Sequence, residues 1–166
     1  MTDHGLMMTG DNVRRILDLL KNMTRRVPAD RFKNWKVGDR IWIRETYIPN
    51  LGEETATYKA NWNEYPNGSG IRFTCKWRPA MFMPKKYARI WAEITELREE
   101  PLLDISYDDI LSEGFNIKTD MPTAEGTAGE VTRLWYQQLW DSLNKKRGFD
   151  WADNPNVKVI GFKYLP

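Results

Sequence analysis

One segment near the middle of the chain restricts the fold more than any other. Between residues 87 and 99, small or branched apolar residues alternate with larger, mostly polar ones. The apolar positions are Ala88, Ile90, Ala92 and Ile94, and the positions between them are Arg89, Trp91, Glu93 and Thr95. Successive side chains of a strand point to opposite faces, so this pattern predicts a strand over Tyr87–Glu99 with one face in a core.

Further strand patterns lie on both sides of this segment. In Arg40–Tyr47, Ile41 and Ile43 fall on one face and Trp42 and Arg44 on the other. The remaining strand-like segments are Thr57–Ala60, Arg72–Trp77 and Val157–Tyr164. Glycines and prolines crowd residues 49–72 and predict a loop there.

Helical patterns occur only at intervals. Apolar residues recur at helical spacing over residues 9–24, where Thr9 or Asp11 is the expected N-cap. Ser106 is expected to cap a short helix that reaches Glu113. A longer helix is predicted over Glu130–Lys146, with its buried stripe at Val131, Leu134, Trp135, Leu139 and Leu143.

Strands thus outnumber helices, and helices do not separate every pair of strands. This predicts an α+β fold with a mostly antiparallel, barrel-like sheet and flanking helices. The 166 residues suit one domain, which we place at residues 9–166 after a flexible N-terminus at residues 1–8.

The scarcity of histidine and cysteine excludes several kinds of active site. His4 is the only histidine and Cys75 the only cysteine. A Ser-His-Asp triad, a Cys-His pair and a zinc deaminase centre therefore lack their parts. A carboxylate-bound Mg²⁺ remains open in principle, but the cluster Asp104, Asp108 and Asp109 is better explained by a helix N-terminus. We expect no metal and no cofactor, and any catalysis must use Lys, Arg, Glu, Asp, Tyr, Ser or Thr.

Charge is unevenly distributed although the net charge is only +2. Ten lysines and arginines lie between residues 14 and 44, and acidic residues gather around 93–113. This asymmetry suits a nucleoside or RNA ligand on one side of the molecule, and a mixed solvated surface is the alternative. No segment has the apolar length of a membrane span or the features of a signal peptide, so we expect a cytoplasmic protein without a membrane partner. The oligomeric state, monomer or dimer, stays open.

Several segments, in this order along residues 13–164, resemble the ASCH family, which has the PUA-like fold. Leu20-Lys21-Asn22-Met23-Thr24-Arg25-Arg26-Val27 resembles the family motif G-R-K-T-x-T-x-R, and Val37–Thr46 resembles the turn and strand that follow it. Other segments resemble a branch often found in phage genomes, which would place the protein in the host cytoplasm. They are Lys76–Pro79, Met83-Pro84, Asp104–Ser106 through Glu113-Gly114, Leu139–Asn144 and Asn154-Pro155.

The resemblance also implies an activity. One bacterial branch of the family consists of small amidohydrolases that deacetylate N(4)-acetylcytidine with a Lys, a Thr and a Glu. By motif these residues fall on Lys21, Thr24 and Glu113, and the final arginine of the motif falls on Arg26. The sequence departs from the motif at three positions, namely Leu19, Leu20 and Asn22.

The chemistry of this trio is consistent without the family. If the helix over residues 9–24 persists, Leu17, Lys21 and Thr24 share one face. Burial or a neighbouring arginine would lower the pKa of Lys21, so that its amine can activate Thr24 as a nucleophile. Glu113 would position water or protonate the leaving amine, or would activate water directly with no acyl-enzyme. The structural alternative is a helix-end lysine, a turn threonine and a surface glutamate.

Six further residues are candidates for ligand binding, namely Arg25, Arg26, Arg44, Glu45, Trp77 and Arg78. Arg44 and Glu45 are adjacent on a strand, so only one of them can face a given pocket, and an internal ion pair is the alternative. Trp77 and Arg78 suit base stacking and phosphate binding, with loop packing as the alternative. The functions that remain are an amidohydrolase, a non-catalytic module that binds RNA or a modified nucleotide, and a ribonuclease.

Overall fold

A five-stranded sheet forms the centre of the computed structural model, which describes residues 1–50, 54–64, 76–120 and 126–166. The strands follow the order β1-β3-β6-β7-β2. Their bounds are β1 Asp3–Met7, β2 Met23–Arg26, β3 Arg40–Arg44, β6 Trp91–Pro101 and β7 Asn156–Leu165. A separate pair is formed by β4 (Tyr47–Pro49) and β5 (Ala56–Tyr58). Cys75 and most of the strand expected at Arg72–Trp77 lie outside the described residues.

The predicted α+β class is confirmed, and most strand pairs are antiparallel. Only β1 and β3 run parallel, whereas β3–β6, β6–β7 and β2–β7 are antiparallel. The edge strands β1 and β2 are not paired with each other in the described chain, so the sheet is open and a closed barrel is not observed.

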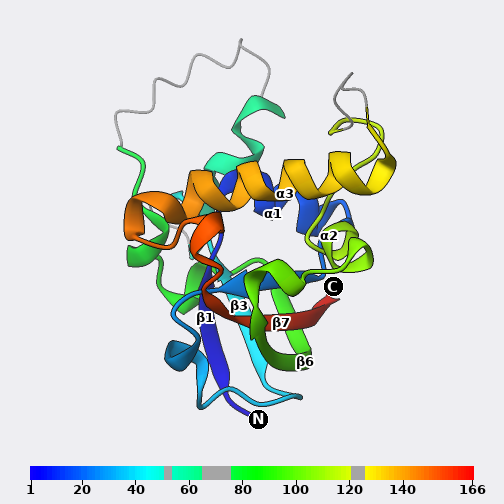
Figure 1. Cartoon of the computed structure of the whole chain (residues 1–166). Coiled ribbons are helices and arrows are strands. Elements are labelled where there is room, and N and C mark those ends of the chain that lie inside the picture. The colour runs from blue at the N-terminus through cyan, green and yellow to red at the C-terminus, as the bar shows by residue number, and fades with distance from the viewer. Residues whose placement is uncertain (51–53, 65–75, 121–125) are drawn as a thin grey trace.

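Three α-helices lie beside the sheet. They are α1 Gly10–Leu17, α2 Tyr107–Ser112 and α3 Ala128–Asn144. In Figure 1, α3 runs across the molecule on one side of the sheet, near α1 and α2, and the N-terminus lies at the far end of the sheet. Short 3-10 helices η1 to η7 supply the remaining turns, at Ala29–Phe32, Lys59–Glu64, Ala80–Phe82, Lys85–Tyr87, Leu102–Asp104, Lys145–Arg147 and Trp151–Asp153.

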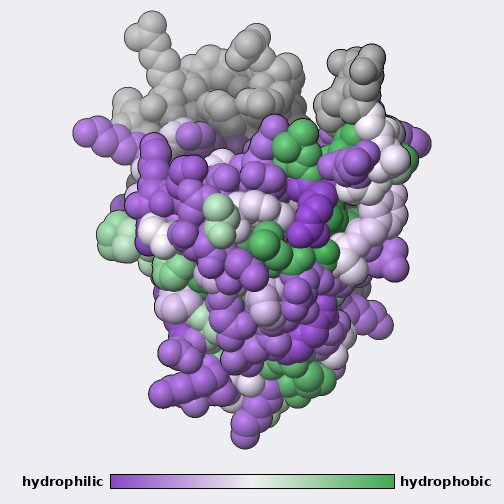
Figure 2. Space-filling view, in the orientation of Figure 1, coloured by the Kyte–Doolittle hydropathy of each residue, from purple (hydrophilic) through white to green (hydrophobic). Residues whose placement is uncertain are grey.

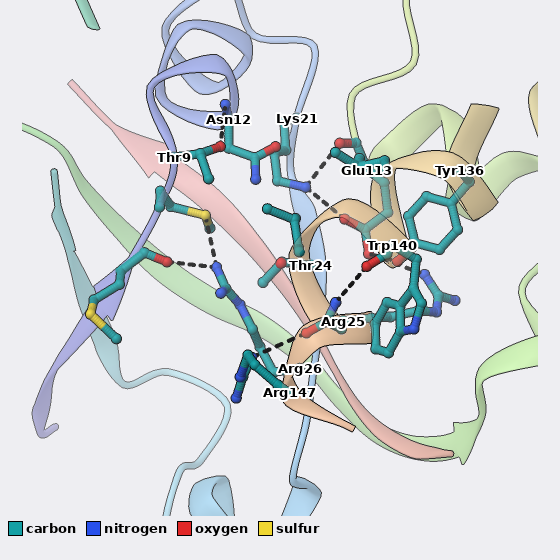
Figure 3. A pocket seen from close by; sticks show the side chains of 15 residues that line it. Thr9, Asn12, Lys21, Thr24, Arg25, Arg26, Glu113, Tyr136, Trp140 and Arg147 are labelled. Carbon is teal, nitrogen blue, oxygen red and sulfur yellow. Dashed lines mark hydrogen bonds and ion pairs between the residues drawn. The ribbon is translucent and has the colours of Figure 1, made fainter. Parts of the chain in front are cut away.

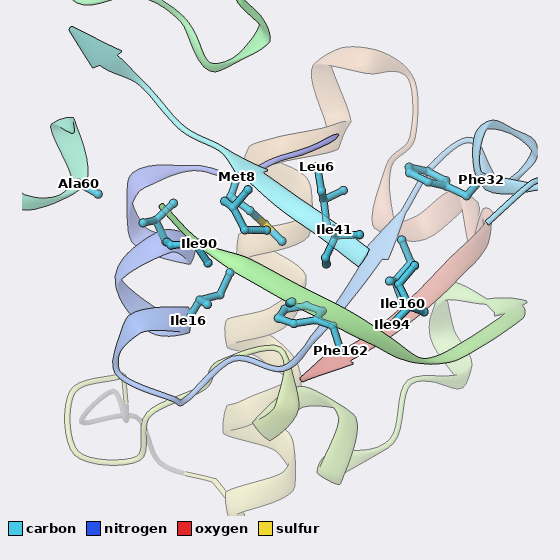
Figure 4. Close-up of a cluster of buried hydrophobic side chains, with 13 residues drawn as sticks. Leu6, Met8, Ile16, Phe32, Ile41, Ala60, Ile90, Ile94, Ile160 and Phe162 are labelled. Atoms are coloured by element: carbon cyan, nitrogen blue, oxygen red, sulfur yellow. The ribbon is translucent and has the colours of Figure 1, made fainter. Parts of the chain in front are cut away.

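The apolar residues divide into two main cores. The first contains Leu6, Ile16, Ile41 and Phe162 and joins the sheet to α1 (Figure 4). The second joins α2 and α3 to strands β2 and β7, with Tyr136 and Trp140 among its buried residues. Helix α1 thus packs in the first core, and helices α2 and α3 pack in the second.

The N-terminal segment, which the sequence analysis expects to be flexible, contains a paired strand in the structure. Residues 3–7 form β1, which pairs with β3 along its whole length. Leu6 and Met8 are buried in the first core. Backbone pairing and the burial of these two side chains hold the segment in place.

The first helix is shorter than predicted. Thr9 caps it as expected, but it ends at Leu17, and Leu19 adopts a left-handed backbone conformation at φ 58°. Residues 23–26 then form β2 against β7. Met23 fits the helical spacing, yet it is buried from a strand, because sheet pairing outweighs local helix propensity here. Lys21 and Thr24 therefore do not share a helix.

The other predicted elements agree more closely. Ile41 and Ile43 are completely buried from β3, and β7 covers the expected final strand. The alternating segment becomes β6 only from Trp91 onward, because residues 85–87 form a 3-10 turn. Ser106 caps α2 as predicted.

The predicted stripe of α3 is partly wrong. Val131 is buried, but Leu134 and Leu143 are exposed, and the inward positions include Tyr136 and Trp140. Both aromatic side chains reach internal acceptors, since Tyr136 bonds to Glu113 and Trp140 to the carbonyl of Phe149. An inward aromatic ring whose polar group is satisfied replaces the leucine stripe.

The surface of the chain is mainly hydrophilic. Figure 2 shows hydrophilic residues over most of the face seen in Figure 1, with hydrophobic residues in smaller groups. In the part of the chain that the structure describes, no helix is long and apolar enough to cross a membrane.

Candidate active site

A cleft of about 230 Å³ opens where β2, the start of α1, the end of α2 and the inner face of α3 meet (Figure 3). Lys21, Thr24 and Glu113 all line it, together with Arg25 and Arg26. The three residues proposed from the sequence as a catalytic trio therefore face one cavity, although no shared helix brings them there.

The centre of the cleft is a buried ion pair between residues 92 positions apart. The Nζ atom of Lys21 donates to Oε2 of Glu113 at 2.6 Å and to the backbone carbonyl of Glu113 at 2.8 Å. Both side chains are almost completely shielded from solvent, at 1% and 4% exposure. A surface lysine and a surface glutamate, the structural alternative from the sequence, are excluded by this burial.

Local backbone geometry brings the two groups together. Glu113 is the C-cap of α2, and the following Gly114 has φ +106°, a conformation that glycine adopts without strain. A Cβ atom at position 114 would lie 3.2 Å from Cβ of Lys21 and 3.0 Å from the Arg15 side chain. Glycine therefore allows the end of α2 to approach the turn that carries Lys21. The Asn22 amide adds a hydrogen bond to the carbonyl of Ser112.

Glu113 has two further partners. The Tyr136 hydroxyl donates to Oε1 at 3.1 Å, and Nη1 of Arg25 lies 3.5 Å from the same oxygen. The sequence prediction missed Tyr136, because an aromatic residue on an amphipathic helix reads as core. Its hydroxyl, which needs a buried partner, was the available clue.

Thr24 differs from its neighbours in that its hydroxyl forms no hydrogen bond. It is buried from β2, and its side chain makes none to any described residue. Figure 3 shows this side chain between Lys21, Glu113 and Arg26. A hydroxyl that lines a cleft and is not engaged by the protein can react with a ligand or bind it.

Arg25 and Arg26 point to different surroundings, as expected of adjacent strand residues. The Arg25 guanidinium is completely buried and pairs with Glu100 and Asp109 as well as with Glu113. Arg26 donates to the carbonyl of Met7 at 2.8 Å and has no carboxylate partner in the described chain. Arg25 is therefore held within the protein, whereas Arg26 has no ion pair and is available to a ligand.

Burial changes the protonation of several groups in this cleft. It lowers the pKa of Lys21 below its ordinary value, and the carboxylate of Glu113 opposes this only in part. Burial likewise raises the pKa of Tyr136 well above its ordinary value, and the charge of Glu113 adds to the effect. Burial also lowers the pKa of Arg26. For Arg25, burial alone would lower the pKa, but its acidic partners raise it above the ordinary value. Lys21 is thus the group for which a neutral amine is most accessible.

The remaining predicted ligand-binding residues do not line this cleft. Glu45 forms a two-point ion pair with Arg89, which is the internal pair named as the alternative from sequence. Trp77 is half-buried, and the backbone of exposed Arg78 bridges to Tyr47. Arg44 lines a different groove, described below.

Other polar residues of the cleft were not predicted from sequence. They include Asn12 on α1, Asn144 at the end of α3 and Arg147 beyond it. Nothing in the spacing of these residues marks them, because they reach the cleft from separate elements. In the described part of the chain, no three His, Cys, Asp or Glu side chains gather where they could hold a metal ion.

Comparisons with known proteins give little further information. No family model matches the chain, and no curated protein matches it. Among solved structures, an ASCH domain from Lactobacillus crispatus is similar, with 12% sequence identity and a TM-score of 0.49, over 98% of this chain and 79% of that one. Similarity at this level does not assign the chain to a family or a function.

Proposed function

We propose that the protein is a small amidohydrolase that acts on an acylated pyrimidine nucleoside such as N(4)-acetylcytidine. The observation that carries the proposal is the buried Lys21–Glu113 pair beside the unbonded hydroxyl of Thr24 in one cleft. A lysine with a lowered pKa next to a hydroxyl is an arrangement that activates a nucleophile. The substrate class comes from the resemblance of residues 20–27 to the ASCH motif.

The first half of the reaction is acyl transfer to Thr24. The neutral amine of Lys21 accepts the hydroxyl proton while Oγ1 bonds to the acyl carbon of the substrate. Arg26 stabilises the negative charge that develops on the acyl oxygen. The C–N bond then breaks, and the amine of the base leaves with the proton from Lys21. The cleft now holds an ester on Thr24.

The second half is hydrolysis of this ester. Glu113 directs a water molecule to the acyl carbon and takes its proton. The ester C–O bond then breaks, and the same proton passes to Oγ1, so that Thr24 leaves as the alcohol and the acid is released. A shorter route is also compatible with the geometry, in which Glu113 activates water for direct attack and Thr24 only orients the substrate. A threonine ester trapped by rapid quench distinguishes the two routes.

The test is the ultraviolet spectrum of N(4)-acetylcytidine during incubation with the protein. We expect turnover by the wild type, its loss in Thr24→Val and its partial retention in Thr24→Ser, which keeps the hydroxyl. Lys163→Met, at an exposed lysine on β7, is the control and should match the wild type. Absence of turnover by folded wild-type protein refutes the proposal.

A second candidate is a non-catalytic module that binds RNA or a modified nucleotide. It is favoured by the two hydrogen bonds that the Glu113 carboxylate accepts from Lys21 and Tyr136. These bonds stabilise the charged carboxylate, which makes it a weaker base. This candidate predicts binding without turnover, and binding by Thr24→Val equal to that of the wild type. Incubation with labelled RNA also reveals any ribonuclease activity.

A further inference from the structure

A second cavity adjoins the cleft. It is a groove of about 670 Å³ that runs beside β1 and η1. Met7, Arg26 and Arg147 line both cavities, so they form a shared wall. Figure 3 shows Arg26 and Arg147 together at one end of the cleft. The two cavities are therefore adjacent, with these two arginines between them.

Four arginines line this groove, namely Arg26, Arg31, Arg44 and Arg147. None of the four pairs with a carboxylate among the described residues. Elsewhere, by contrast, Arg15, Arg25, Arg40, Arg89 and Arg98 each have an acidic partner. The groove thus gathers four arginines without an ion pair in the described chain, whereas the other described arginines without one, Arg78 and Arg133, lie outside it.

The groove contains little that would neutralise this charge. Of the described residues that line it, Asp3 is the only one with a carboxylate, and Arg40 and Lys85 already bind both oxygens. The arginines are instead held by uncharged groups: Arg26 bonds to the carbonyl of Met7, and Arg147 to the carbonyl of Val27 at 3.3 Å. The exposed Arg31 side chain forms no hydrogen bond to any described residue. Within the described chain, Nε of Arg26 and Nε of Arg44 are the only side-chain nitrogen or oxygen atoms that are completely shielded from solvent and have no partner.

The volumes of the two cavities also favour a ligand that reaches the groove. Pockets that enclose small-molecule ligands commonly measure about 300–1,000 Å³. The cleft alone falls below this range and the groove lies within it. A ligand that only filled the cleft would leave the arginine groove unused.

We propose, on the basis of the amidohydrolase function above, that the substrate carries phosphate: an acylated pyrimidine nucleotide whose base reacts in the cleft and whose phosphate lies in the arginine groove. Guanidinium groups match phosphate oxygens with paired hydrogen bonds and retain their charge at all physiological pH values. The phosphate belongs either to a mononucleotide or to the backbone of an oligoribonucleotide, and the experiment separates these two sources.

The experiment is calorimetric titration of the protein with cytidine and with its 5′- and 3′-monophosphates. We expect at least one monophosphate to bind about tenfold more tightly than cytidine. Arg31→Gln should remove most of this preference, because Arg31 lines the groove and does not line the cleft. Lys33→Gln removes the same charge from a neighbouring exposed residue that does not line the groove, and it should retain the preference. Arg44→Gln serves as a second groove variant.

Equal affinity for cytidine and both monophosphates in the wild type refutes the phosphate site, as does an equal loss in Arg31→Gln and Lys33→Gln. A short oligocytidylate gives the source: similar affinity to the monophosphate indicates a mononucleotide, and tighter binding that weakens with salt indicates a polynucleotide. Failure of the amidohydrolase proposal looks different, because tight binding of the monophosphate would then persist without deacetylation of either N(4)-acetylcytidine or its monophosphates.

Discussion

Glu45 and Glu113 are both buried glutamates with a basic partner, yet their surroundings give them different roles. Glu45 is held at two points by Arg89, at 2.8 and 2.9 Å, and Arg89 also bonds to Asn61 and lies over the ring of Tyr58. Glu113 is paired with Lys21 and faces the cleft. An arginine stays charged, whereas a buried lysine can release its proton. The first pair therefore suits structure and the second suits proton transfer.

The comparison teaches that burial of an ion pair does not by itself identify a functional site. Both carboxylates are almost completely shielded. Among the described residues, they differ in the identity of the cation, in the cleft that Glu113 lines and in the unengaged hydroxyl of Thr24 beside its pair. Each difference can be tested by removing one partner and measuring activity and stability separately.

The largest expected difference is in catalysis. Lys21→Met should reduce deacetylation of N(4)-acetylcytidine by about 10²- to 10⁴-fold, the usual contribution of a general acid–base group. Arg89→Met, which disrupts the other pair, should leave the turnover of the folded protein within about twofold of the wild type. Steady-state kinetics on both purified variants is the measurement. Similar losses in both variants would mean that the Lys21 pair has no special catalytic role.

The order of the two variants should reverse for stability. Arg89→Met leaves Glu45 buried without a cation and should lower the free energy of unfolding by about 3–5 kcal/mol. Lys21→Met leaves Glu113 with Tyr136 and Arg25, so we expect a smaller cost, about 1–3 kcal/mol. Urea unfolding followed by tryptophan fluorescence measures both. A larger loss in Lys21→Met would show that its pair with Glu113 is the more important of the two for stability.

Tyr136→Phe tests whether Glu113 is positioned by its third partner. The change removes one hydrogen bond to a charged group and should lower the free energy of unfolding by about 1.5–3 kcal/mol. Because the phenol does not reach substrate in the proposed mechanism, the pH profile of turnover should keep its shape while its height falls. Tyr164→Phe, which changes a half-buried tyrosine on β7, is the matched control. A shifted profile would instead give Tyr136 a direct part in proton transfer.

The alternating pattern and the capping residues predicted much of the fold. Ile41, Ile43 and Ser106 lie as expected, because their local patterns agree with the tertiary structure. The pairing of β1 with β3 and of β2 with β7 was not predictable in this way, because short edge segments owe their conformation to partners far along the chain.

The candidate site shows the same division. The motif resemblance selected Lys21, Thr24 and Glu113, but the argument that placed Lys21 and Thr24 on one helix face was wrong. Their meeting depends on a left-handed turn at Leu19, on β2 pairing and on Gly114. Tyr136 and the groove arginines come from separate elements, so no spacing in the sequence marks them.

The smallest expected difference between the two pairs is the dependence of stability on pH. Burial lowers the pKa of Lys21 in the folded state, whereas the unfolded lysine titrates near 10.4. Between these two values the unfolded chain binds more protons, so this group makes unfolding less favourable as pH rises, by at most about 1.4 kcal/mol per pH unit. Lys21→Met should lose this contribution, and Arg89→Met should keep it.

Urea unfolding at pH 7.0 to 9.5 measures the effect as the difference between wild type and Lys21→Met. The upper limit matters because of Tyr136. Its raised pKa keeps the phenol protonated in the folded state while the unfolded phenol ionises near pH 10, so stability falls above that value. If the wild type and Lys21→Met show the same slope below pH 9.5, the buried amine does not change its protonation on unfolding in this range. Lys21 would then be a fixed charge like Arg89, and Glu113 alone would remain to activate water.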